Sequence, residues 1–208
     1  MMKFRSLCIG IDLDGTLVDY AAVFHRLAVE AGLVPQALAT DKYAIRDHIR
    51  RNHGDKAWQA LQAQAYGEQM VTARLFDGVP DTLRHWTEEG LSLKIVSHKS
   101  QYTTLLGENG PDLHYYALPC LRLWGVLDYI PQQNIFFCPT RKAKCLQISA
   151  LGCDVFIDDL TEIFADKAFL DTVCSVLFSP TGYSGTHNVS AVCADWGQVC
   201  EYVAQLRG

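Results

Sequence analysis

The feature that most constrains this chain is an apolar run that ends in two carboxylates. Residues 6–11 read Ser-Leu-Cys-Ile-Gly-Ile, and Asp12, Asp14 and Gly15 follow almost directly. This pattern predicts a buried strand that stops abruptly, with Gly15 allowing a sharp turn. In an open parallel sheet ligands bind at the carboxyl ends of the strands, where a carboxylate can act as a nucleophile or hold Mg²⁺. The alternative is that Asp12 and Asp14 only cap a helix and form a turn.

Residues 9–17 read Ile-Gly-Ile-Asp-Leu-Asp-Gly-Thr-Leu and resemble the first motif of the haloacid dehalogenase-like hydrolases. This superfamily is dominated by Mg²⁺-dependent phosphatases. The resemblance implies that Asp12 is the nucleophile, that Asp14 is the general acid and base, and that Gly15 and Thr16 contact the substrate. Relatives that displace halide lack an acid at the position of Asp14, and phosphonate-cleaving relatives have a small residue there. The resemblance therefore implies hydrolysis of a phosphomonoester through an aspartyl-phosphate.

The second and third motifs of the superfamily have candidates in the expected order. Ser97 ends a predicted strand, where relatives bind the phosphoryl group through a hydroxyl and the next backbone N–H, here that of His98. The alternative for Ser97 is a helix cap. The third motif is a lysine, needed because the phosphoryl group and the nucleophile are both negative. Its spacing favours Lys144, and Lys142 and Arg141 remain alternatives.

The fourth motif follows the apolar residues 155–157 as Asp158 and Asp159. Adjacent like charges after a buried strand repel each other, and a bound divalent cation offsets that cost. The resemblance implies a Mg²⁺ site formed by Asp12, Asp158, Asp159 and the backbone carbonyl of Asp14, with Asp159 beside the lysine or holding a metal-bound water. Glu162 matches a downstream acid of some relatives, and a surface helix is the alternative reading for it.

The order of predicted elements indicates an α/β fold with a Rossmann-like parallel sheet and helices on both faces. This core is expected over residues 1–19 and 77–208, including helices near 101–106 and over 112–126, the latter bent or broken at Pro119. Residues 20–76 read as three helices without a strand, which predicts a small all-helical cap inserted after the first strand. The sheet order of the superfamily would place Asp12 and Asp158 opposite each other at the switch point.

Composition narrows the possible partners. The net charge of −5 argues against binding a nucleic acid polymer, and no apolar run is long enough to span a membrane. The first motif lies too close to Met1 for a secretory signal, so a cytoplasmic location is expected. The eight cysteines contain no Cys-x-x-Cys pair and are expected to be buried, reduced thiols.

The expected substrate is a small phosphorylated metabolite or a nucleotide. A phosphotransferase or mutase would share every motif, and a catalytically silent binding protein of the same fold is a further alternative. The predicted cap carries a basic cluster that could meet an anionic substrate or form a solvated helix face. Its members are Arg46, His48, Arg50, Arg51 and His53.

Overall fold

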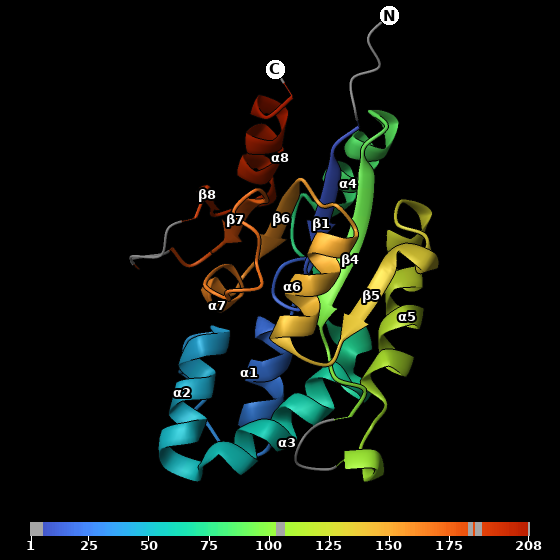
Figure 1. Cartoon of the computed structure of the whole chain (residues 1–208). Coiled ribbons are helices and arrows are strands. Elements are labelled where there is room, and N and C mark those ends of the chain that lie inside the picture. The colour runs from blue at the N-terminus through green and yellow to red at the C-terminus, as the bar shows by residue number, and fades with distance from the viewer. Residues whose placement is uncertain (1–5, 103–106, 183–184, 186–188, 208) are drawn as a thin grey trace, which may run out of the picture. The chain divides into compact units, whose positions relative to one another are not determined.

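The computed structural model describes residues 6–102, 107–182, 185 and 189–207. The chain divides into two compact units (Figure 1). The first, here called the core unit, comprises Met1–Leu17, Leu75–His98 and Gly125–Gly208. The second, here called the helical unit, comprises Val18–Arg74 and Lys99–Trp124. Residues 99–124, which were expected in the core, thus group with residues 18–74 rather than with the sheet.

The core unit contains a six-stranded sheet in the order β5-β4-β1-β6-β7-β8, with parallel neighbours throughout. The strands are β1 Cys8–Ile11, β4 Ser92–His98, β5 Ile135–Cys138, β6 Val155–Asp158, β7 Cys174–Phe178 and β8 Ala191–Cys193. All residues of the central strand β1 are buried, as expected for a parallel strand covered on both faces. The Rossmann-like sheet is confirmed, and β8 is a strand that the sequence did not predict.

Helices cover both faces of this sheet (Figure 1). Helices α4 (Val79–Glu88) and α8 (Trp196–Gln205) lie on one face, where the rings of Trp86 and Trp196 are 6.0 Å apart. Helices α6 (Arg141–Ala150) and α7 (Thr161–Phe164) lie on the other. On this second face a Cβ on Gly10 would lie 2.6 Å from the Phe156 ring, so only glycine fits at this point of β1. Two short 3-10 helices, Val126–Asp128 and Gln132–Asn134, precede β5.

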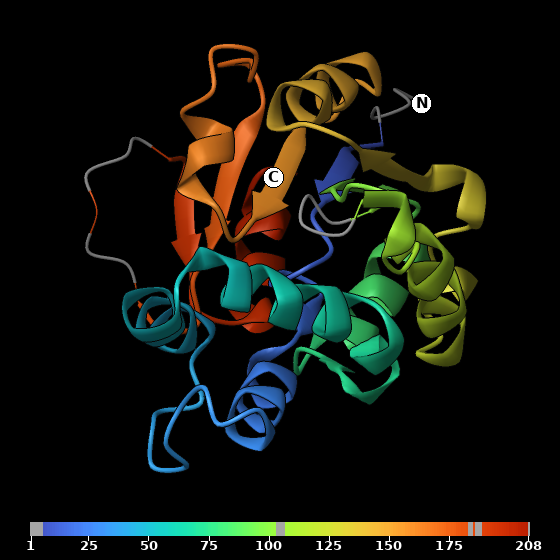
Figure 2. The ribbon, with the colours of Figure 1, turned by 90° about the horizontal axis from the view of Figure 1, so that it is seen from below.

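The helices of the helical unit, drawn as ribbons in Figure 2, pack around aromatic rings. Its elements are α1 Ala21–Glu30, α2 Lys42–His53, α3 Asp55–Tyr66, α5 Leu113–Leu123 and the 3-10 helices Glu68–Thr72 and Gly107–Asn109. The ring of Phe24 stacks on that of Trp58, and Tyr20 meets Tyr66 edge-on, both at 4.9 Å between centroids. Buried aromatic pairs of this kind add to the stability that area burial supplies, which explains how a small set of helices holds together.

Three details differ from the sequence-based expectations. The segment 20–76, predicted as all-helical, also contains the short strand β3 (Arg74–Leu75), which pairs with β2 (Val18–Asp19) just before that segment. Helix α5 runs through Pro119 and ends at Leu123, because buried residues on both sides of the proline hold the helix in place. Of the helix expected near 101–106, residues 103–106 lie outside the described residues, and 101–102 are not helical.

The exposed surface of α2 carries the basic cluster. Arg46 pairs with Asp47 at 2.8 Å and Arg50 with Asp55 at 2.7 Å, so part of the positive charge of the cluster is balanced locally.

No helix in the described part of the chain combines the length and apolar character needed to cross a membrane. Burial of the cysteines is confirmed for six of the eight, and Cys174 and Cys200 are partly buried.

Candidate active site

Asp12 and Asp158 lie side by side at the carboxyl ends of β1 and β6. Ile11 and Ile157 are in register on these neighbouring strands, and the backbone N–H of Asp12 donates to the Ile157 carbonyl at 2.9 Å. Asp12 is 5% exposed and Asp158 is fully buried. The sheet order therefore brings together two carboxylates from opposite ends of the sequence, at the switch point where α/β proteins bind ligands.

Lys144 lies between these two carboxylates. Its Nζ donates to Asp12 Oδ1 and to Asp158 Oδ2, each at 2.5 Å, and the side chain is 1% exposed. The helix that carries it, α6, is capped by Thr140, whose hydroxyl accepts a hydrogen bond from the Ala143 N–H at 3.0 Å. Burial lowers the pKa of Lys144, but the two carboxylates outweigh that effect and hold the pKa above its ordinary value.

The other two cations considered from the sequence, Arg141 and Lys142, are exposed on the same helix. Positions 141 and 142 lie on the first turn of α6, whereas position 144 faces the sheet. The geometry thus distinguishes Lys144 from both alternatives as the cation in contact with the carboxylates.

Asp158 is held in an environment with excess negative charge. Burial raises its pKa to about 8, Lys144 opposes that rise, and the charges of Asp12 and Asp159 add to it. Its other oxygen, Oδ1, accepts from the Leu160 N–H at 2.9 Å.

Asp12, Asp158 and Asp159 each offer one carboxylate oxygen, and the three oxygens lie within 4.8 Å of one another. One lysine balances only part of the charge of three carboxylates, so this donor set suits a hard divalent cation such as Mg²⁺. The predicted contribution of Asp14 is its backbone carbonyl, and its carboxylate is not a member of this cluster.

The turn after Asp12 is shaped by close contacts. Gly15 has a φ of 101°, and a Cβ at this position would lie 2.4 Å from Asp159 Oδ2. The glycine therefore provides both the turn and the space for Asp159. The Thr16 carbonyl accepts from Trp196 Nε1 at 3.1 Å, which anchors the loop to α8. Thr16 Oγ1 is buried and has no hydrogen-bond partner in the parts of the chain that the structure covers.

Ser97 and His98 end β4, the other neighbour of β1. Ile95 is in register with Ile11, so Ser97 lies at the same edge of the sheet as Asp12, and it is 1% exposed. The His98 side chain is exposed. Partial burial lowers its pKa, and the positive charges of Lys144 and Arg141 lower it further.

Glu162 is exposed on α7 and is not part of the carboxylate cluster, in agreement with a surface helix.

Lys99 directly follows Ser97 and His98, yet it is 3% exposed, and its ammonium group lies 4.7 Å from the Tyr66 ring centroid in the helical unit. Lys99 was not among the predicted site residues, although a cation directly after two candidate site residues is a signal that the sequence contains. Trp196 was also missed, and no local pattern could have linked it to Thr16.

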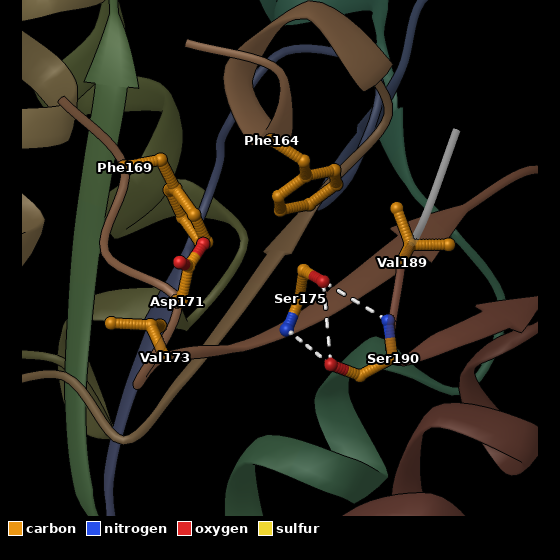
Figure 3. A pocket seen from close by; sticks show the side chains of 7 residues that line it. All are labelled: Phe164, Phe169, Asp171, Val173, Ser175, Val189 and Ser190. Atoms are coloured by element: carbon orange, nitrogen blue, oxygen red, sulfur yellow. Dashed lines mark hydrogen bonds between the residues drawn. The ribbon is translucent and has the colours of Figure 1, made fainter. Parts of the chain in front are cut away.

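A separate hollow of about 230 Å³ lies beside β7 and β8 (Figure 3). Ser175 and Ser190 line it and bond to each other, with the Ser190 N–H donating to Ser175 Oγ at 3.0 Å. Asp158 pairs with Leu177, two residues beyond Ser175, so the hollow lies toward the opposite ends of the strands from the carboxylates. Its other lining residues are Phe164, Phe169, Asp171, Val173 and Val189.

Comparison of the sequence with known families and with curated proteins gives no match. Comparison of the structure with solved structures gives matches. A haloacid dehalogenase-like hydrolase from Streptococcus pneumoniae aligns with a TM-score of 0.63 at 16% identity, over 95% of this chain and 98% of that one. A hydrolase of the same superfamily from Deinococcus radiodurans, with bound phosphate and sodium, aligns with a TM-score of 0.57 at 15% identity, over 96% of both chains.

A third structure is a hydrolase of this superfamily from Bacillus subtilis, bound to magnesium. It aligns with a TM-score of 0.56 at 11% identity, over 96% of this chain and 99% of that one. These alignments extend over nearly the whole of each chain. This chain therefore has the haloacid dehalogenase-like fold.

Proposed function

We propose that this chain is a Mg²⁺-dependent phosphatase that hydrolyses a small phosphomonoester through an aspartyl-phosphate on Asp12. The observation that carries the proposal is the buried contact of Lys144 with both Asp12 and Asp158, at the edge where β1 and β6 meet. Such a lysine holds a carboxylate in place and offsets the repulsion between that carboxylate and an incoming phosphate.

The carboxylates of Asp12, Asp158 and Asp159, with the backbone carbonyl of Asp14, would hold Mg²⁺. When bound, the ion would neutralise charge on the phosphoryl group and favour its approach to Asp12. Burial raises the pKa of Asp158 to about 8, and the charges of Asp12 and Asp159 add to that rise; this excess negative charge supports the assignment. The bound magnesium of the Bacillus structure and the bound phosphate of the Deinococcus structure support the ion and the substrate class, respectively.

The chain's own residues account for both half-reactions. The Asp12 carboxylate attacks phosphorus, and the bond to the leaving oxygen breaks as Asp14 donates a proton to that oxygen. Asp14 then takes a proton from water, and this water attacks the aspartyl-phosphate to release inorganic phosphate and restore Asp12. The Ser97 hydroxyl and the His98 backbone N–H hold the phosphoryl oxygens in both steps.

The helical unit is proposed to act as a cap that sets substrate specificity. Its two segments begin directly after candidate site residues, one after the turn that contains Thr16 and the other after His98. Insertions at such positions can exclude water and contact the leaving group. A small phosphorylated metabolite or a nucleotide in the cytoplasm is the proposed substrate.

The test is a screen of phosphomonoesters with Mg²⁺, followed by acid-quenched trapping with labelled substrate. We expect release of inorganic phosphate and a covalent label on the wild-type chain. Asp12→Asn should lose both the label and turnover, because the amide keeps the shape but does not attack phosphorus. Asp128→Asn, at an exposed acid of the core unit, is the matched control and should keep both.

The same experiment separates the alternatives. Transfer of the label to an added alcohol acceptor instead of water would make the chain a phosphotransferase. If the wild-type chain hydrolyses no phosphomonoester in the screen and acquires no covalent label, the proposal fails and a silent binding protein is the better interpretation.

A further inference from the structure

Two buried thiols, Cys8 and Cys153, lie together at the amino-terminal ends of β1 and β6. A Cβ on Gly10 would lie 2.9 Å from Cys153 Sγ, which places this sulfur over the face of β1 that contains Gly10. Cys8 shares that face because alternate residues of a strand point the same way. The Cys8 thiol donates to the Leu151 carbonyl at 3.8 Å, two residues before Cys153, and Cys8 and Cys153 are 8% and 5% exposed.

The backbone around this pair fits a disulfide. Ile9 is in register with Val155, and the Cys8 N–H donates to Asp154 Oδ2 while the Asp154 N–H donates to the Cys8 carbonyl, both at 2.8 Å. Cys153 directly precedes Asp154, the backbone partner of Cys8, and lies two residues before the first residue of β6. Disulfides bridge Cα atoms roughly 4.4–6.8 Å apart, so a cysteine next to the backbone partner of Cys8 is a suitable partner for a bridge.

The chemical surroundings distinguish Cys8 from the other thiols. The neighbouring Cys153 thiol lowers the pKa of Cys8 to about 7, against the effect of burial, with help from Ser92 and the charge of Lys94. The charge of Asp154 opposes this shift. Burial raises the pKa of Cys145 to about 11. Because the thiolate is the reactive form, Cys8 combines a nucleophilic sulfur with a second thiol in contact.

We propose that Cys8 and Cys153 form a reversible redox site that a peroxide converts to a disulfide. The Cys8 thiolate attacks one peroxide oxygen, the O–O bond breaks, and Cys8 becomes a sulfenic acid as hydroxide leaves. The Cys153 sulfur then attacks the Cys8 sulfur, the S–S bond forms, and water leaves with the Cys153 proton. In sum, two thiols and one hydrogen peroxide give one disulfide and two waters.

This site is independent of the proposed phosphatase activity. Asp12 and Asp158 lie at the carboxyl ends of the same two strands, whereas the thiols lie at the amino ends. The bridge would link Cys8 to Cys153 and so close a loop that contains most of the chain. Cross-links that close long loops restrict the unfolded chain, so the oxidised protein should unfold at a higher temperature than the reduced protein.

The experiment treats the folded full-length chain with hydrogen peroxide, blocks remaining thiols by alkylation and maps non-reduced peptides by mass spectrometry. We expect the first disulfide to join the Cys8 and Cys153 peptides, to disappear with dithiothreitol and to raise Tm. In Cys153→Ser the link should be absent and a sulfenic acid on Cys8 should be trapped by dimedone. Cys145→Ser removes another buried thiol of the same core cluster and should leave the link intact.

Three results would overturn the proposal. These are oxidation of other cysteines while Cys8 stays reduced, pairing of Cys8 with a different cysteine, and formation of the Cys8–Cys153 link only after denaturation. If Cys153→Ser does not fold, the peptide map of the wild-type chain still decides between these results and the expected one.

Discussion

Replacing Lys144 with methionine tests how much the buried contacts of Lys144 with Asp12 and Asp158 stabilise the fold. Methionine has nearly the same length and fills the buried space, so the change removes chiefly the charge that contacts Asp12 and Asp158 at 2.5 Å. Removing one partner of a buried ion pair leaves the other charge uncompensated and costs ~3–5 kcal/mol. That loss is a large share of the roughly 5–15 kcal/mol that stabilises a typical domain.

The loss should depend on pH, and its sign follows from the pKa shifts. Asp158 has its pKa raised from 3.8 to about 8, so the folded chain binds a proton more readily than the unfolded chain over that window. Its contribution to stability therefore falls as pH rises from 3.8 to about 8. The raised pKa of Lys144 means that its contribution is present throughout this window and is lost only at higher pH. Without Lys144 the pKa of Asp158 should rise further, so stability should fall more steeply towards pH 8.

The measurement is urea unfolding with a metal chelator present, at mildly acidic pH and at pH about 8, since the pKa of Asp158 lies there. With a typical urea slope of ~2 kcal/mol per M, Lys144→Met should lower the midpoint by about 1.5–2.5 M at the higher pH and by less at the lower one. Lys142→Met, at an exposed lysine on the same helix, should stay within about 0.5 kcal/mol of wild type. Equal stability of the two variants, or a loss from Lys144→Met that does not grow with pH, would refute the reasoning.

Three further outcomes are expected. Asp14→Asn should slow both half-reactions, so that an aryl phosphate with a good leaving group labels Asp12 and the label accumulates, whereas an alkyl phosphate gives little label; equal wild-type and variant rates on both substrates would remove Asp14 from the mechanism. Chelation should abolish turnover, Mg²⁺ should restore it and excess Ca²⁺ should inhibit, because Ca²⁺ prefers a larger coordination shell; full activity after exhaustive chelation would contradict the metal assignment. Gly15→Ala should weaken Mg²⁺ binding measured by calorimetry, because the added Cβ would lie 2.4 Å from Asp159 Oδ2 in a backbone conformation with φ of 101°; unchanged affinity would show that the loop yields easily.

The sequence by itself determined the strands that carry the candidate site and the end of each strand at which its polar residues lie. A continuous apolar run followed by aspartate marks β1 and β6, because parallel strands buried on both faces carry few polar residues until they end. The family resemblance added the sheet order, and the structure confirms it. Spacing favoured Lys144 over Lys142, but spacing did not reveal that Lys144 contacts two carboxylates at once.

Only the tertiary structure decided the contacts made across long sequence separations. Trp196 holds the Thr16 carbonyl, Asp159 occupies the space left by Gly15, and residues 99–124 group with the helical unit. The strand β8 was missed because three residues carry too little pattern to be recognised alone. Patterns along the chain report local backbone preference and the burial of one face. Which buried faces meet, and which charges become neighbours when they do, depends on packing the whole chain at once.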